Sequence, residues 1–425
     1  MSSIDSAAPI GELHSSNYER GSAMRRYMIL YAFAALAGSA VWGGVGGVLL
    51  PLHVQQMEFA AKAGNLAMIK SVAVAVTMVL QPLIGIASDR TRSRWGRRAP
   101  WLVAGSIASV AGLIGMRYSS SVAQLLAGWI VAQVGVTMVL GPLGATVADR
   151  MPAAQRGLMS AVAGIGVLIG FVLGTTVAGS LFGKFQLGSY LVFAAAVLIF
   201  SIAFVLAARD RPSLAMRVEP VSMGTHLLSC TYALRDRNFR WVWIARVLMM
   251  FGYASAATYT IYMLQSYIQP AQTAAQAART VSLLYLASLP GTFLGMAITG
   301  RWSDRVMRRK PFVIGASFLL AASMIVPLAW PTLAAFYVQF VVGGVAFGTF
   351  LAVDQALLID VLPSTGAAGR DLGMGQFAAN LGSVLGPVLA GAVLSATGGY
   401  QMIWLASSLL AVFAAFALMP VRPTA

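Results

Sequence analysis

Two ionisable side chains lie well inside long apolar stretches of this sequence, where they could carry out proton chemistry. Arg246 comes six residues after Arg240, and Asp354 comes six residues before Asp360. At the rise of an α-helix, roughly 1.5 Å per residue, both lie about 9 Å from the same edge of the apolar layer. Equal depth and opposite charge predict an ion pair. Asp354 is then either a proton acceptor tuned by Arg246 or one half of a static pair that neutralises two buried charges.

Uncharged polar side chains in the apolar stretches could bind a neutral molecule. Gln376, Asn380 and Ser383 follow i, i+4, i+7 spacing, which places them on one face of a helix. Amides form hydrogen bonds with hydroxyl groups and aromatic faces pack against the CH groups of sugars, so these residue types suit a polyhydroxylated substrate. The other candidates are Gln355, Tyr253, Tyr259, Gln133 and Trp42. The alternative role of each is a hydrogen bond between helices.

Similar charged turns interrupt the apolar stretches about half a chain apart. The first is Gly85-x-x-x-Asp89-Arg90, and the second, 215 residues later, is Gly300-x-x-x-Asp304-Arg305. A further pair is Asp149 and Asp360, which are 211 residues apart. This recurrence predicts a duplicated unit whose two copies have the same orientation in the membrane.

We expect these turns to form a latch at one face of the molecule. The two glycines would let helices approach closely, and Asp89 and Asp304 would accept hydrogen bonds from neighbouring helix N-termini. Arginines would bridge to carboxylates across this face, with Asp149 and Asp360 as acceptors, and the bridges would break when the two halves separate. The arginines concerned are Arg90, Arg97, Arg98, Arg156 and Arg305. The alternative is that such arginines only anchor the topology.

The composition indicates a membrane protein. Of the 425 residues, 58% are hydrophobic and 10% are charged, whereas soluble proteins have about 25% charged residues. Many apolar runs reach the roughly 20 residues that a helix needs to cross a bilayer. We predict an all-α polytopic membrane protein with twelve spans, at 27–50, 65–88, 99–117, 121–148, 157–183, 188–208, 240–265, 279–300, 311–330, 332–359, 372–396 and 399–420.

The distribution of charge predicts the orientation of these spans. Most of the 29 Lys and Arg residues fall in the loops on one side, which the positive-inside rule places in the cytoplasm together with both termini. The expected location is the plasma membrane. The predicted units are a tail at 1–26, a six-helix bundle at 27–208, a linker at 209–239, a second six-helix bundle at 240–420 and a tail at 421–425. A helix lying on the membrane surface is expected at 222–236 of the linker.

The twelve-span layout and the two Asp-Arg turns resemble the major facilitator superfamily, whose signature loop follows the second helix of each half. Residues 88–100, which include Ser-Asp-Arg and Arg-Trp-Gly-Arg-Arg-Ala-Pro, are similar to the form found in sucrose and glycoside–pentoside–hexuronide symporters, and 353–363 fits that branch loosely. The resemblance implies a secondary transporter that works by alternating access, with proton-coupled uptake of a sugar or glycoside. The alternative is proton-coupled efflux of amphipathic compounds, which the 20 Phe and 21 Met favour.

Other functional classes have no supporting motif in the sequence. It lacks the Gly-x-x-x-x-Gly-Lys-Ser/Thr loop that binds nucleotide phosphates, and its three His and single Cys230 form no metal cluster or catalytic constellation. The net charge of +16 lies in short loops rather than on one face, which argues against a nucleic-acid partner. We therefore expect no enzyme activity, cofactor or metal. The expected partners are a small-molecule substrate, protons and the lipid bilayer, and the chain is expected to be a monomer.

Overall fold

The computed structural model describes residues 22–151, 153–208, 212–214, 231–306, 308–363 and 368–422. Regular secondary structure in these ranges is helical throughout, so the predicted all-α class is confirmed. Most of the surface helix predicted at 222–236 lies outside the described residues. The part that is described forms a single 3-10 turn, η3 (Thr231–Arg235).

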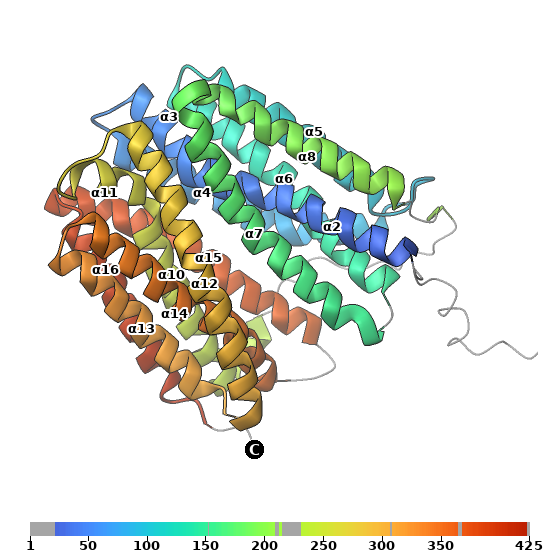
Figure 1. Cartoon of the computed structure of the whole chain (residues 1–425). Coiled ribbons are helices and arrows are strands. Elements are labelled where there is room, and N and C mark those ends of the chain that lie inside the picture. The colour runs from blue at the N-terminus through green and yellow to red at the C-terminus, as the bar shows by residue number, and fades with distance from the viewer. Residues whose placement is uncertain are drawn as a thin grey trace, which may run out of the picture.

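The first half of the chain forms one bundle of helices, coloured blue to green in Figure 1. Its first span consists of α2 (Ser22–Ala40), the π-helix η1 (Val41–Leu49) and α3 (Leu50–Met57) in succession. The spans that follow are α4 (Lys62–Arg90), α5 (Ala99–Arg117), α6 (Val122–Arg150), α7 (Ala153–Phe185) and, after the 3-10 turn η2 (Gln186–Ser189), α8 (Tyr190–Ala207).

The second half forms a second bundle, coloured yellow-green to red. It begins with α10 (Arg237–Thr258) and α11 (Thr260–Ser266), which are bent by 41° with respect to each other. The remaining helices are α12 (Ala274–Val306), α13 (Lys310–Ala329), α14 (Leu333–Asp360), α15 (Ala368–Thr397) and α16 (Gln401–Leu418).

The helices of the described residues account for the predicted spans. Ten helical stretches there are long and apolar enough to cross a membrane, or eleven if the bent pair α10 and α11 is one span. One of the ten, Leu158–Ala207, has 50 residues and contains both α7 and α8. A straight helix of this length would measure about 75 Å, more than twice the thickness of a hydrocarbon core. The chain turns at η2, where Gln186 has a φ of 45°, so α7 and α8 are separate spans and the count agrees with twelve.

The two halves repeat the same helix packing. In the first half, α2 packs against α7, α4 against α6, and α5 against both α6 and α8. In the second half, α10 packs against α15, α12 against α14, and α13 against both α14 and α16. Equivalent N-caps also recur, because Ser121 accepts a hydrogen bond from the N–H of Gln124 before α6, as Thr332 does from Ala335 before α14. The duplication seen in the charged turns therefore extends through both bundles.

Glycines allow close packing of helices within each half. A Cβ atom added to Gly170 of α7 would lie 2.5 Å from the carbonyl oxygen of Leu36 in α2. In the equivalent pair of the second half, a Cβ added to Gly386 of α15 would lie 2.5 Å from the Cβ of Ala254 in α10. Small residues at these positions let the backbones approach, which is how helices gain van der Waals contact in a membrane.

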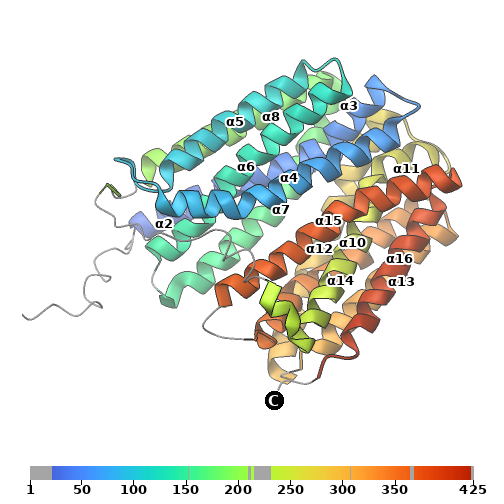
Figure 2. The ribbon, with the colours of Figure 1, turned by 180° about the vertical axis from the view of Figure 1, so that it is seen from behind.

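Hydrogen bonds join the two halves at one end of the molecule. We call the end that carries Asp89, Asp149, Asp304 and Asp360 the charged end, and the bonds lie toward the opposite end. They run from Tyr262 Oη to Pro51 O (2.7 Å), from Tyr259 Oη to Ala63 O (2.7 Å) and from Ser282 Oγ to Thr175 O (2.5 Å). In Figure 2, α4 and α15 come together near α3 and α11 and diverge toward their other ends. The molecule is thus closed at the opposite end.

We predict that Gly170→Val destabilises the protein by about 1–3 kcal/mol, because the added atoms force α7 away from α2. Thermal melting of the purified chain in detergent measures this. Gly144→Ala is the control, since a Cβ at that helical position meets no atom within 4 Å and alanine favours the helix. Equal melting temperatures for Gly170→Val and the wild type would contradict the packing described here.

Candidate functional site

A cavity of about 660 Å³ lies between the halves, on the charged side of the bonds that close the molecule. Its walls come from α7 of the first half and from α10 to α14 and α16 of the second half. On α7 the lining residues lie between Ala163 and Val172, before Thr175, and on α12 they lie between Tyr285 and Met296, after Ser282. The closing bonds therefore separate the cavity from the opposite end.

Aromatic side chains form much of the cavity wall. Tyr253 stacks on Phe347, with ring centroids 4.4 Å apart and planes inclined by 11°. Tyr285 meets Phe171 of the first half edge-on at 5.2 Å and Phe340 at 5.1 Å. None of the described residues that line the cavity is Asp, Glu, Lys, Arg or His. The cavity therefore suits a flat, uncharged molecule better than one rich in hydroxyl groups.

Of the predicted substrate-binding residues, Tyr253 lines this cavity and the others lie outside it. Tyr259 is fully buried and its hydroxyl is bound to Ala63, so its role is in closing the opposite end. Gln133 is buried in α6, and Trp42 lies on η1 and packs against the core. Polarity or aromatic character in the sequence did not reveal which face of each helix meets the cavity.

The predicted polar face on α15 forms a row of amides that reaches the other half. Gln376 Nε2 donates to Asn380 Oδ1 at 3.3 Å, and Asn380 Nδ2 donates to Gln81 Oε1 of α4 at 3.2 Å. We call Gln376, Asn380 and Gln81 the amide row. Ser383 uses its hydroxyl within its own helix, to the carbonyl of Ala379 at 2.9 Å. The amide row joins the halves, but it lies outside the cavity lining.

The structure brings Arg246 and Asp354 together. Arg246 Nη1 lies 3.2 Å from Asp354 Oδ2, and the two side chains are 11% and 4% exposed. The same nitrogen donates to Oε1 of Gln355 at 3.1 Å. Leu351, about one helical turn before Asp354, lines the cavity. A buried ion pair therefore lies beside the cavity, on the helices α10 and α14 that form its wall.

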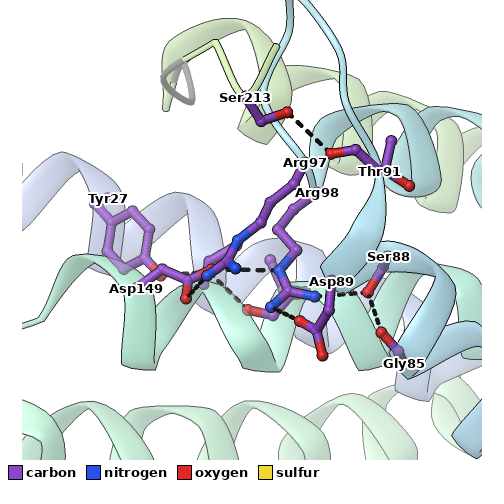
Figure 3. A network of polar contacts seen from close by, with 11 residues as sticks. Tyr27, Gly85, Ser88, Asp89, Thr91, Arg97, Arg98, Asp149 and Ser213 are labelled. Carbon is purple, nitrogen blue, oxygen red and sulfur yellow. Dashed lines mark hydrogen bonds and ion pairs between the residues drawn. The ribbon is translucent and has the colours of Figure 1, made fainter. Parts of the chain in front are cut away.

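At the charged end of the first half, Arg98 holds two carboxylates and a hydroxyl (Figure 3). Its guanidinium forms ion pairs with Asp89 and, at 3.3 Å, with Asp149, and it donates to Ser88 Oγ at 2.6 Å. Arg97 forms a further ion pair with Asp149. Because Arg98 is only 5% exposed, its charge depends on these partners. The cluster ties the ends of α4 and α6 to the start of α5.

The second half has the equivalent cluster around Arg309. Its guanidinium lies 2.5 Å from Asp360 and 3.7 Å from Asp304, and it donates to the carbonyl of Ala356 at 2.8 Å. Arg309 was absent from the prediction made from sequence. The offset of 211 residues that relates Asp149 to Asp360 also relates Arg98 to Arg309, and this was the signal that could have found it.

The ion pairs of Arg97, Arg98 and Arg309 each join helices of the same half. A movement of the halves as rigid bodies would leave these pairs intact, so they strengthen each half instead of latching the two halves to each other. Among the other predicted arginines, Arg305 is exposed and Arg90 is half-buried at the end of α4, whereas the side chain of Arg156 lies outside the described residues.

The expectation that Gly85 and Gly300 bring helices close together is wrong. A Cβ on Gly85 would meet no atom within 4 Å, and the nearest atom to one on Gly300 is the Cβ of Ala352 at 3.9 Å. The recurring feature is a hydrogen bond to the carbonyl of each glycine. Ser88 Oγ donates to Gly85 at 2.9 Å and Ser303 Oγ donates to Gly300 at 3.0 Å.

Comparison with protein families identifies the class. The model of the Major Facilitator Superfamily matches residues 27–294 and again residues 257–425, which together cover almost the whole chain. The chain belongs to the Major Facilitator Superfamily. It is a membrane transporter and not an enzyme, and the resemblance of its Asp-Arg turns to this superfamily is confirmed.

Solved structures of transporters share the fold. A bacterial homolog of the human lysosomal transporter Spinster, in an inward-facing and unoccupied conformation, has a TM-score of 0.71 and 13% identity over 93% of this chain and 95% of that one. The nucleoside transporter NupG has a TM-score of 0.73 and 16% identity, over 93% of this chain and 100% of that one. At such identities, the likeness concerns the fold alone.

A short segment is similar to a curated relative. It is 52% identical over 48 residues to the uncharacterized symporter sll1374 of Synechocystis sp.. The match covers 11% of this chain and 8% of that relative, so the two proteins are related here only through a small part of their length.

We predict that Arg98→Ala lowers the stability by about 3 kcal/mol, because it removes the arginine that pairs with both Asp89 and Asp149 and leaves Asp149 with Arg97 alone in a partly buried site. Thermal melting in detergent measures the effect. Arg92→Ala, which removes an exposed arginine from the same loop, should leave the melting temperature within about a degree of the wild type, as surface substitutions commonly do. If the two variants melted alike, Arg98 would not have the structural role assigned to it.

Proposed function

We propose that this transporter exports amphipathic compounds in exchange for protons, by alternating access between the two sides of the plasma membrane. One observation carries the proposal: the buried Arg246–Asp354 pair lies beside an aromatic-lined cavity whose described residues bear no charge. The pair offers a group that can accept a proton. The cavity offers a binding site for a largely apolar molecule.

Protonation of Asp354 would change the charge of this region by one unit. In the ionised state, Asp354 and Arg246 neutralise each other in surroundings that hold little water. If Asp354 took up a proton, Arg246 would lose its counter-charge and keep the hydrogen bond to the amide oxygen of Gln355. The Nε of Arg246 has no hydrogen-bond partner among the described residues. Arg246 would then move toward new partners. Because the pair joins α10 to α14, this movement would couple protonation to the arrangement of the cavity wall.

The walls of the cavity favour an amphipathic substrate over a sugar. A sugar brings several hydroxyl groups, and each one buried without a partner costs about 1–3 kcal/mol. The rings of Tyr253, Phe347 and Tyr285 instead favour an apolar substrate, because the burial of apolar surface against them stabilises the complex. A molecule that is mostly aromatic or aliphatic, with few polar groups, would therefore bind best in this cavity.

The proposed orientation places the charged end and both termini in the cytoplasm, since the loops on that side carry most of the basic residues. The cavity lies on the cytoplasmic side of the closing bonds in this orientation. Amphipathic compounds from the cytoplasm or the inner leaflet would reach it from there, which favours export. The proposed working unit is the monomer, because one chain supplies the cavity, the buried pair and both arginine clusters.

Proton-coupled uptake of a sugar or glycoside is a second candidate. The amide row favours it, because Asn380 and Gln81 come from different halves and form a hydrogen bond of 3.2 Å. Hydroxyl groups of a sugar could replace this bond with hydrogen bonds to the two amides. The short similarity to a symporter is consistent with uptake. In this case the substrate would bind between α4 and α15 instead of in the aromatic cavity.

We predict that Asp354→Asn abolishes accumulation driven by a pH gradient but retains exchange of labelled for unlabelled compound without a gradient. The amide keeps the size of the side chain and cannot carry the proton. Proteoliposomes and a panel of labelled neutral aromatic amides and glycosides provide the measurement. Glu58→Gln, which alters an exposed carboxylate near the opposite end, is the control and should keep both activities. Loss of exchange as complete as the loss of accumulation would rule out Asp354 as the proton site.

The two candidate substrates are distinguished by one variant in each site. We predict that Tyr253→Leu reduces transport of the neutral dye Nile red about tenfold, because the ring that stacks on Phe347 is lost, whereas Asn380→Ala changes it less than twofold. Fluorescence of the dye in inverted membrane vesicles measures both. Loss of labelled glycoside transport in Asn380→Ala, with normal transport in Tyr253→Leu, would favour sugar uptake instead.

A further inference from the structure

The cavity continues from the gap between the halves into the interior of the second half. Leu320 and Met324 of α13 line it, as does Trp404 of α16. Helix α13 packs against α14, α16 packs against α10, and the two pack against each other. Figure 1 shows them on the side of the second half that lies away from the first. The cavity therefore has an inner end enclosed by one half.

Two polar atoms at the inner end are buried without a partner. Gln339 is 8% exposed, and its Oε1 accepts no hydrogen bond from any described residue. Trp404 is 1% exposed, and its Nε1 donates none within the same part of the chain. Both residues are among those that line the cavity. Each such atom costs stability, and an unsatisfied group in a native protein calls for an explanation in terms of function, strain or a missing partner.

Trp404 of α16 contacts α14 about one turn from Gln339. The ring of Trp404 meets Phe336 edge-on at 5.4 Å, and Phe336 lies about one turn before Gln339 on α14. One turn after Gln339, Gly343 lines the cavity without a side chain. A Cβ there would lie 3.3 Å from Gln339 Nε2. The missing side chain thus makes room for the amide of Gln339.

We propose that the inner end of the cavity binds the hydroxyl or carboxamide group of a neutral amphipathic substrate. The substrate donates a hydrogen bond to Gln339 Oε1 and accepts one from Trp404 Nε1. This proposal rests on the export function proposed above and names the class of compound more narrowly. Groups that both donate and accept, such as an alcohol, a phenol or an amide, satisfy both atoms at once.

The surroundings select against charged compounds and against plain hydrocarbons. None of the described lining residues is Asp, Glu, Lys, Arg or His, so a carboxylate or an ammonium group would be buried without a counter-charge. A hydrocarbon would fill the space but leave Gln339 and Trp404 unsatisfied. The aromatic body of the substrate would lie toward the stacked rings of Tyr253 and Phe347, and its polar group would point inward.

The test compares two fluorescent probes that differ by one hydroxyl group, 1-pyrenemethanol and 1-methylpyrene. Their binding to the full chain in detergent is measured against empty micelles. We predict that the wild type binds 1-pyrenemethanol about tenfold more tightly, the size expected for one good hydrogen bond to a buried group. Gln339→Leu should abolish this preference without weakening the binding of 1-methylpyrene, and Trp404→Phe should reduce it.

A matched glutamine variant and a measurement of stability serve as controls. Gln272→Leu also removes a glutamine whose Oε1 has no described partner, but it lies outside the cavity and should keep the tenfold preference. Gln339→Leu should melt at or above the wild-type temperature, because it removes an unsatisfied polar group.

The possible failures are distinguishable. If the wild type binds both probes and Gln339→Leu keeps the preference for 1-pyrenemethanol, the polar subsite is wrong and the proposed export of amphipathic compounds stands. Equal binding of the two probes by the wild type overturns the subsite in the same way. If neither probe binds the wild type, the aromatic cavity does not take amphipathic compounds, and both proposals fail.

Discussion

A charge shielded from water needs a partner close by, and this constraint shapes the whole molecule. Each half uses one arginine, Arg98 or Arg309, to hold carboxylates from the ends of two other helices. These contacts tie three helix ends together at the charged end of each half. Because the partners belong to the same half, the clusters make each half a stable body and leave the boundary between the halves free to change.

The boundary between the halves is held by weaker and more local contacts. Neutral hydrogen bonds such as that from Tyr262 to Pro51 close the opposite end, and each bond of this kind contributes about 1 kcal/mol. Breaking a few of them costs far less than dismantling an arginine cluster. The arginine clusters can therefore stay intact while the hydrogen bonds between the halves break. Alternating access requires such a difference in strength.

The buried pair and the cavity belong mainly to the second half. Arg246 and Asp354 connect α10 to α14, and both helices contribute aromatic side chains to the cavity wall. A change of charge at the pair therefore acts directly on the helices that would contact the substrate. Among the described residues, the first half contributes one helix, α7, to the cavity lining. The proposed binding and proton transfer are therefore concentrated on one side of the boundary.

The sequence predicted the features that depend on hydropathy and on depth along a helix. Runs of apolar residues located the spans, and equal distance from the membrane edge brought out Arg246 and Asp354, which the structure places 3.2 Å apart. The lining of the cavity could not be predicted in this way. Tyr253 and Tyr259 are six residues apart and so lie on different faces of a helix, but the sequence does not show which face meets the cavity.

Other features needed the three-dimensional arrangement for a different reason. Gln339 and Trp404 look like ordinary core residues in the sequence, because their unsatisfied atoms appear only when the neighbours are known. Gly85 looked like a site of close packing, but a Cβ added there would meet no atom within 4 Å. The repeat offset of 211 residues was sufficient to identify Arg309, since it already related two aspartates.

In alternating access, the two stable halves would move against each other. Pairs of spin labels in a Cys230→Ser background measure it by pulsed electron paramagnetic resonance in nanodiscs, at acidic and alkaline pH. One pair, at Arg92 and Arg308, spans the halves at the charged end, and the other, at Ser120 and Thr397, spans them at the opposite end. We expect one distance to shorten as the other lengthens. Distances that stay constant, or that change in the same sense, would contradict it.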